Sequence, residues 1–221
     1  MAYHYAHSFS GLNKFETCPR QYEWRYILKH REPETDAKSW GKRVHSAFED
    51  KVRDDKPLPV GMQSYEWALT PIQAAKNVGA CVLLEHKIAM DQAGVPVVFE
   101  SEKAYVRAIV DVAILGKHSA ILGDYKTGGR FRPSTQLQFS TWIAFHTWPA
   151  IEIVDTKYLY LKLKHTEPET LHRSKIHQLA GNILPRLHKL ERARASGVFE
   201  PKPGGLCRQY CQVVTCEFHG R

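Results

Sequence analysis

The spacing of apolar residues changes along the chain from a helical period to a strand period. In the N-terminal part, Trp40, Val44 and Phe48 recur at helical spacing, whereas β-branched residues dominate the extended pattern that begins near Val95. Helices are predicted over residues 8–28 (two short ones), 39–54, 71–91, 135–147 and 174–195, the second-to-last opened by a capping box of Thr135 and Gln138. Strands are predicted over residues 95–102, 104–115, 120–126 and 151–163.

This order of elements indicates an α/β fold. Helices come first, then three strands, a helix, a strand and a final helix, which favours a central mixed sheet flanked by helices. No stretch of the sequence reads as a linker between independent domains, so residues 1–221 are expected to form a single domain.

Composition and charge narrow the classes of protein that fit. Hydrophobic residues make up 43% and charged residues 24% of the 221 positions, which excludes wholesale disorder and collagen-like repeats. No apolar run approaches the roughly 18 residues of a membrane span, and residues 1–7 lack the pattern of a signal peptide, so we expect a cytoplasmic protein without membrane contact. The 31 Lys and Arg against 23 Asp and Glu give a net charge of +8, which favours a polyanionic partner such as nucleic acid.

Two acidic residues are predicted to meet across a β-hairpin. If residues 116–119 form the loop, Leu115 pairs with Ala120 and the register places Asp111 opposite Asp124, with Cβ atoms roughly 5 Å apart. Lys126 leaves the same strand face as Asp124 because the two are two residues apart. Such hard oxygen ligands suit Mg²⁺ or Mn²⁺. The alternative is an exposed hairpin with ordinary charges, but Asp111 lies in an apolar strand, where a carboxylate without a partner is costly.

The five cysteines are unevenly placed. Cys207, Cys211 and Cys216 lie within ten residues of one another, His219 is nearby, and Cys18 is close to the start of the chain. In a chain without a signal peptide, this density favours Zn²⁺ or an iron–sulfur cluster over disulfides, and free thiols remain the third alternative. The remaining cysteine, Cys81, is expected to be a small core residue on the apolar face of a helix.

Five short motifs in order together resemble the PD-(D/E)XK nuclease superfamily, in particular its RecB-like and CRISPR-associated (four-cysteine) exonuclease branch. They are Ser10-Gly11-Leu12-Asn13-Lys14-Phe15-Glu16-Thr17-Cys18-Pro19-Arg20-Gln21-Tyr22, Gly41-Lys42-Arg43-Val44-His45, Ile109-Val110-Asp111, Asp124-Tyr125-Lys126-Thr127-Gly128 and Gln136-Leu137. The resemblance covers nearly the whole chain. It implies a restriction-endonuclease-like α/β core.

The resemblance also implies roles for individual residues. Asp111, Asp124 and the backbone carbonyl of Tyr125 would bind Mg²⁺ or Mn²⁺, with His45 as a further ligand. Lys126 would be the catalytic lysine, and Gln136 would help to place the scissile phosphate or Lys126.

A second group of roles follows from the same branch. Cys18, Cys207, Cys211 and Cys216 match the arrangement that holds a [4Fe–4S] cluster in many of its members. Such a cluster would join the N-terminal helices (residues 1–30) to the Cys-rich tail (residues 197–221) within the one domain.

The function that the resemblance implies is metal-dependent hydrolysis of DNA. The expected activity is that of an exonuclease on single-stranded or end-exposed DNA in recombination, repair or end processing, in a bacterium or a phage-infected cell, with a helicase or recombination protein as partner. Basic residues near the motifs are candidates for phosphate contacts: Lys42, Arg43, Arg130 and Arg132. The alternatives are a non-catalytic DNA-binding subunit of a recombination or CRISPR-adaptation complex and a structure-specific endonuclease.

Overall fold

The computed structural model describes residues 6–129 and 135–221. Its chain divides into two compact units. The first is built mainly from residues 34–179, and the second from residues 7–33 and 180–221. Within the described residues, no helix is both long enough and apolar enough to cross a bilayer.

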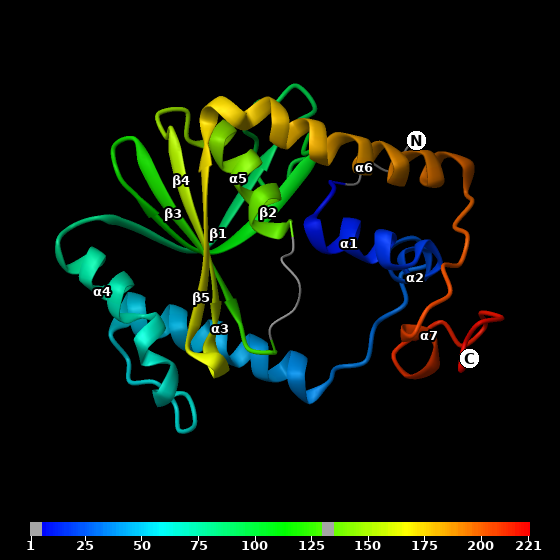
Figure 1. Ribbon diagram of the computed structural model, residues 1–221, viewed down its shortest axis with the longest axis horizontal. Coiled ribbons are helices and arrows are strands. Elements are labelled where there is room, and N and C mark those ends of the chain that lie inside the picture. Colours follow the sequence, from blue (N-terminus) through cyan, green and yellow to red (C-terminus); the bar gives the residue numbers. More distant parts are fainter. Residues whose placement is uncertain (1–5, 130–134) are drawn as a thin grey trace. The chain divides into compact units, whose positions relative to one another are not determined.

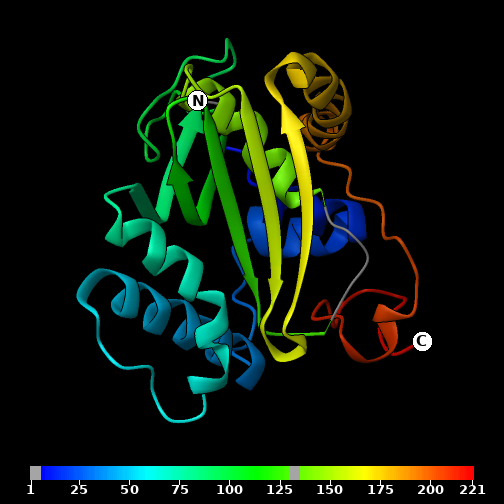
Figure 2. The same ribbon diagram turned by 60° about the vertical axis from the view of Figure 1, so that its left-hand side comes forward.

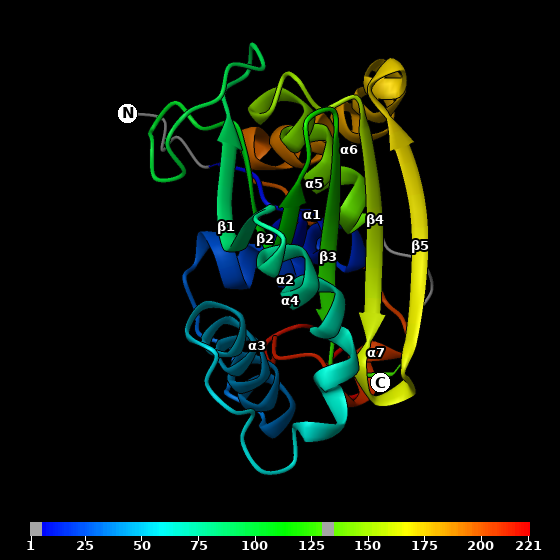
Figure 3. The ribbon, with the colours of Figure 1, turned by 90° about the vertical axis from the view of Figure 1, so that its left-hand side faces the viewer.

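The first unit is built on a mixed β-sheet (Figure 1). Among the described residues the sheet has five strands in the order β1-β2-β3-β4-β5, which Figure 3 shows side by side. The pair β3–β4 is parallel and the other pairs are antiparallel, so the predicted mixed sheet is confirmed. The strands are β1 (Cys81–Met90), β2 (Val106–Leu115), β3 (Ser119–Lys126), β4 (Ile153–Tyr160) and β5 (His165–His172).

Helices cover this sheet, as predicted for an α/β fold. They are α3 (Asp36–Asp54), α4 (Thr70–Asn77) and α5 (Gln136–Thr147). The hydroxyl of Thr35 accepts a hydrogen bond from the Lys38 amide and so caps the N-terminus of α3. Figure 2 shows α3 and α4 beside each other at one side of the strands. Tyr125 joins the apolar cluster under α3, whereas its neighbour Asp124 bonds the first residue of α5. Because adjacent strand residues point to opposite faces, α3 and the start of α5 lie on opposite faces of the sheet.

The residue before Asp124 is a glycine because side chains from the two neighbouring strands leave no room for a Cβ atom there. A Cβ atom at Gly123 would lie 2.6 Å from Cγ1 of Val112 on β2 and 3.2 Å from Cδ1 of Leu159 on β4. Both neighbours are buried beneath α3. The glycine therefore allows the three central strands to pack tightly next to the acidic residue.

The predicted helix over residues 71–91 is wrong. Helix α4 ends at Asn77, Gly79 takes a positive φ of 80°, and β1 begins at Cys81. A glycine with positive φ is a common helix terminator, and the apolar run after it is free to extend. Cys81, expected in the core of that helix, is instead exposed at the start of β1.

Two further predictions are wrong, and one strand was not predicted. Residues 95–102 form no strand beyond an isolated bridge between Met90 and Pro96, because the Asp91 carboxylate accepts hydrogen bonds from Ala93 and Val95 and turns the chain. Strand β5 was not predicted, since its polar sequence lacks an alternating pattern. The capping box at α5 is absent: Thr135 makes no capping bond, and Gln138 donates to Glu169 across 2.8 Å.

The second unit brings the two ends of the chain together. Its helices are α1 (Phe9–Thr17), α2 (Pro19–Tyr22), a π-helical turn (Glu23–Ile27), most of α6 (Ile176–Ser196) and α7 (Leu206–Gln209). Arg186 donates two hydrogen bonds to Glu16, of 2.6 and 2.7 Å, and the ring of Tyr22 stacks on that of Phe199. The hydroxyl of Ser8 caps α1 by accepting a hydrogen bond from the Gly11 amide.

Candidate active site and metal centre

Three side chains from α3, β1 and β2 converge at one point of the first unit. Nδ1 of His45 lies 3.0 Å from Oε1 of Glu85 and 3.7 Å from Oδ1 of Asp111. Each residue offers one ligand atom, and these three atoms all lie within 4.8 Å of one another. The spacing brings two of the predicted residues, His45 and Asp111, together with Glu85, which was not predicted.

The backbone of β1 and β2 explains how the two acids reach His45. The paired residues run from Leu84–Val112 to His86–Val110 and omit Glu85 and Asp111. Glu85 adopts a φ of +44°, a left-handed conformation that is strained for a residue with a side chain. The regular ladder is therefore interrupted where the two carboxylates face the imidazole, and strain of this kind is typical of functional sites.

The β2–β3 hairpin follows the predicted register. Leu115 pairs with Ala120, and the paired residues continue to Val112–Gly123, one step short of the two aspartates. There the Asp111 carboxylate takes the place of a backbone acceptor, with its Oδ2 accepting from the Tyr125 amide over 2.8 Å. This bond fixes Asp111 against the strand that carries Asp124.

Lys126, Asp124 and Gln136 form a closed hydrogen-bonded group next to the first three residues. Nζ of Lys126 lies 2.5 Å from Oδ2 of Asp124 and donates to Oε1 of Gln136 over 3.0 Å. Nε2 of Gln136 donates in turn to Oδ1 of Asp124 over 2.6 Å. The predicted catalytic lysine thus sits between an acid from its own strand and the first residue of α5.

Burial and mutual repulsion change the proton affinity of the acids. Burial, assisted by the nearby Asp124 carboxylate, raises the pKa of Asp111 to about 7 against the opposing effect of His45. Burial also raises the pKa of Asp124, while the Lys126 ammonium lowers it. For His45, burial favours the neutral imidazole, but the hydrogen bond to Glu85 and the charge of Asp111 outweigh it and raise the pKa to about 9.

This donor set fits a divalent cation. Carboxylate oxygens and an imidazole nitrogen are ligands that Mg²⁺ and Mn²⁺ accept. Asp111 and Asp124, whose pKa values are raised, are relieved of repulsion when a cation takes the place of their protons. His45, Glu85 and Asp111 would hold such an ion, with Asp124 beside them.

Glu85 could not be recognised from sequence because its environment was assigned to a helix. Once residues 81–90 are read as a strand, Glu85 is an isolated acid between Leu84 and His86 in a half-buried segment. That is the same signal that singled out Asp111 among its apolar neighbours. Its left-handed φ has no sequence signature, since glycine and asparagine are the usual residues in that region.

The candidate DNA-binding residues are only partly located. Lys42 and Arg43 lie on α3 near His45, where Lys42 pairs with Glu34 over 3.0 Å and the Arg43 guanidinium lies over the Trp40 ring. Arg130 and Arg132 lie outside the described residues. The phosphate contacts of all four residues therefore stay predictions.

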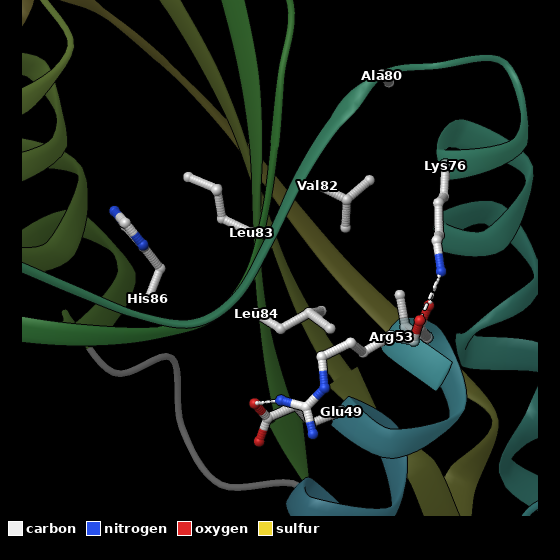
Figure 4. A pocket seen from close by; sticks show the side chains of 9 residues that line it. Glu49, Arg53, Lys76, Ala80, Val82, Leu83, Leu84 and His86 are labelled. Carbon is white, nitrogen blue, oxygen red and sulfur yellow. Dashed lines mark hydrogen bonds and ion pairs between the residues drawn. The ribbon is translucent and has the colours of Figure 1, made fainter. Parts of the chain in front are cut away.

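A cleft of about 390 Å³ lies beside the site, between α3, the end of α4 and β1 (Figure 4). Leu84 and His86, the neighbours of Glu85, line it together with Val82. The basic side chains that line the cleft already have hydrogen-bond partners: Arg53 donates to Glu49, and Lys76 donates to backbone carbonyls in the last turn of α3. None of the candidate metal ligands or catalytic residues lines this cleft, so the candidate active site is the group around His45, Glu85 and Asp111.

In the second unit, the four cysteines predicted as cluster ligands line one small cavity. Cys18, Cys207, Cys211 and Cys216 all border it, together with His219. Burial raises the pKa of the Cys211 thiol, and the other three thiols act in the same direction. Among the described residues, these cysteines do not form a group as close as that of His45, Glu85 and Asp111.

Comparisons with known proteins identify the family of the chain. The sequence model of the PD-(D/E)XK nuclease superfamily matches residues 6–216. No curated protein matches the chain.

Solved structures of low sequence identity also match. The crystal structure of LHK-Exo in complex with dAMP is 12% identical, with a TM-score of 0.40 over 86% of this chain and 92% of that one. A second structure of that alkaline exonuclease, from Laribacter hongkongensis, is 10% identical, with a TM-score of 0.32 over 87% and 93%. The crystal structure of SSO0001 is 12% identical, with a TM-score of 0.30 over 79% and 84%.

Proposed function

The chain belongs to the PD-(D/E)XK nuclease superfamily, and we propose that it hydrolyses phosphodiester bonds of DNA as a divalent-metal-dependent exonuclease on single-stranded or end-exposed substrates. The observation that carries the proposal is the convergence of His45, Glu85 and Asp111 beside the Lys126–Asp124 pair. A structural ion pair would not need three further ligand groups at the same point.

The chain's own residues divide the work of hydrolysis. His45, Glu85 and Asp111 would hold the cation, and Asp124 would lie beside it, paired with Lys126. A divalent cation bound there supplies a Lewis acid for the scissile phosphate and lowers the pKa of the attacking water. The backbone carbonyl of Tyr125 is proposed as a further ligand.

Lys126 acts on the phosphate directly. Its ammonium group donates hydrogen bonds to a phosphate oxygen and offsets the negative charge that develops as water adds to phosphorus. The bond between phosphorus and the leaving oxygen then breaks; the attacking water releases a proton to the solvent, and the leaving oxygen takes up a proton from the solvent. Gln136 holds Nζ of Lys126 in place for this contact.

The proposal includes both units and a cellular setting. The family match spans residues of both units, which supports one nuclease domain with the N-terminal helices and Cys-rich tail joined. The net charge of +8 supports a DNA partner. We place the activity in recombination, repair or end processing in the cytoplasm of a bacterial or phage-infected cell, with unwinding supplied by a helicase or recombination protein.

End-labelled DNA tests the proposed activity directly. Linear single strands labelled at the 5′ or the 3′ end, matching duplexes and covalently closed single-stranded circles are incubated with Mg²⁺ or Mn²⁺. We expect the linear single strands to be degraded and the circles to persist. Cleavage of circles would identify an endonuclease instead. Binding without any cleavage would identify a non-catalytic DNA-binding subunit.

A [4Fe–4S] cluster held by Cys18, Cys207, Cys211 and Cys216 is the second part of the proposal. A zinc ion with Zn–S bonds of about 2.3 Å needs sulfur atoms roughly 3.8 Å apart, and among the described residues these four thiols do not form a close metal-ligating group. In a cluster, each thiolate binds a different iron, so thiols spread around one cavity suit it better.

Purification without oxygen tests the cluster. We expect brown protein with about four irons per chain by metal analysis, and loss of both colour and iron in Cys211→Ser. Cys81→Ser is the matched control, since Cys81 is exposed on β1, and it should keep the iron. Colourless protein with one zinc per chain would overturn this assignment.

A further inference from the structure

The first turn of α5 is held by a tyrosine from the sheet rather than by a capping side chain. Thr135 makes no capping hydrogen bond, and the Leu137 amide donates to Oη of Tyr158 on β4 over 3.1 Å. Both residues are buried. Because a buried amide without an acceptor is costly, the Tyr158 hydroxyl holds the helix start where Gln136 lies.

The ring of the same tyrosine lies against the lysine of the site. Tyr158 pairs with Asp124 in the parallel ladder between β3 and β4, which places both side chains on one face of the sheet. Nζ of Lys126 lies 5.5 Å from the centre of the Tyr158 ring, within reach of a cation–π interaction. One side chain therefore contacts Lys126 and also holds the turn that carries Gln136.

We propose that Tyr158 is a positioning residue that sets the geometry of the Lys126–Gln136–Asp124 group. The inference rests on the proposed nuclease function for its catalytic consequence. Tyr158 lies beneath Lys126 and beside the α5 start, and it acts through the hydrogen bonds of Gln136 to Lys126 and Asp124. Without its hydroxyl, the first turn of α5 loosens and Gln136 no longer holds Lys126.

The experiment removes the hydroxyl and keeps the ring with Tyr158→Phe. We expect kcat to fall about tenfold with KM within about twofold, and the Leu137 amide to exchange its hydrogen at least about tenfold faster. In a Gln136→Ala background, Tyr158→Phe should change kcat by less than about twofold, because the route through Gln136 is already broken. Tyr158→Leu, which also removes the ring, should lower kcat further than Tyr158→Phe.

Tyr65→Phe is the matched control. Tyr65 is a buried tyrosine in the core beneath α3, on the face of the sheet opposite the start of α5, so its variant should leave Leu137 exchange and kcat unchanged. Unchanged Leu137 exchange in Tyr158→Phe would overturn the inference whether or not the protein cleaves DNA. Equal losses of kcat in the wild-type and Gln136→Ala backgrounds would also overturn it. Absence of cleavage by the wild type would instead refute the proposed function, while the exchange measurement still decides the anchoring of α5.

Discussion

Replacing Asp124 with asparagine or Lys126 with methionine is expected to lower the rate of DNA cleavage by at least about 10³-fold. Asp124→Asn removes the charge that faces both the cation site and Lys126, and Lys126→Met removes the only amine bonded to Asp124 among the described residues. Metal-assisted stabilisation of a developing charge is worth several kcal/mol, and each 1.4 kcal/mol corresponds to about a factor of ten in rate. The measurement is the initial rate on an end-labelled single-stranded oligonucleotide.

The same variants should stay folded and bind DNA. Both replacements keep the side-chain volume. Burial raises the pKa of Asp124 because it disfavours the charged carboxylate, so Asp124→Asn removes a charge that does not stabilise the folded state. Asp155→Asn on β4 is the matched control, because Asp155 accepts a hydrogen bond from Thr170 and has no proposed role in binding or catalysis. Rates within tenfold of wild type in both site variants would refute the assignment of this site.

Local sequence determined the parts of the site that lie within one hairpin. The register of β2 and β3 depends only on a four-residue loop and a strand period of two, so the proximity of Asp111 and Asp124 was predictable. His45 entered through a motif on a helix, and the structure places it against Asp111. The hairpin inference needed only periodicity and residues close in sequence, whereas the role of His45 came from the resemblance to the nuclease family.

The part that could not be predicted depends on tertiary structure. The apolar residues of Cys81–Met90 fit a helix or a strand equally well, and the segment forms a strand because it completes the edge of the sheet beside β2. Because this segment was predicted to be helical, Glu85 was not recognised as a candidate metal ligand. Tyr158 could not be assigned a role either, since its contacts come from a parallel pairing of strands that lie far apart in sequence.

Adding Mn²⁺ to metal-free protein is expected to raise its unfolding temperature. A ligand at 100 times its Kd stabilises a folded protein by about 2.7 kcal/mol, which corresponds to roughly 5–11 °C for a chain of this size. Thermal unfolding followed by circular dichroism, in EDTA and in Mn²⁺, measures the shift. Asp111→Asn and His45→Ala should abolish most of it, whereas Asp155→Asn should retain it.

The stabilisation should grow with pH. The Asp111 pKa of about 7 lies above its unfolded value, so the metal-free protein loses stability as pH rises from about 4 through 7 and this carboxyl ionises beside Asp124. The raised pKa of His45 acts in the same direction, because its contribution is complete below about pH 6.5 and is lost as pH rises through about 9. The cation binds the deprotonated groups and removes their repulsion, so the shift caused by Mn²⁺ should be larger at about pH 8.5 than at about pH 6. A shift that is independent of pH, or one that survives in Asp111→Asn, would mean that the cation binds elsewhere.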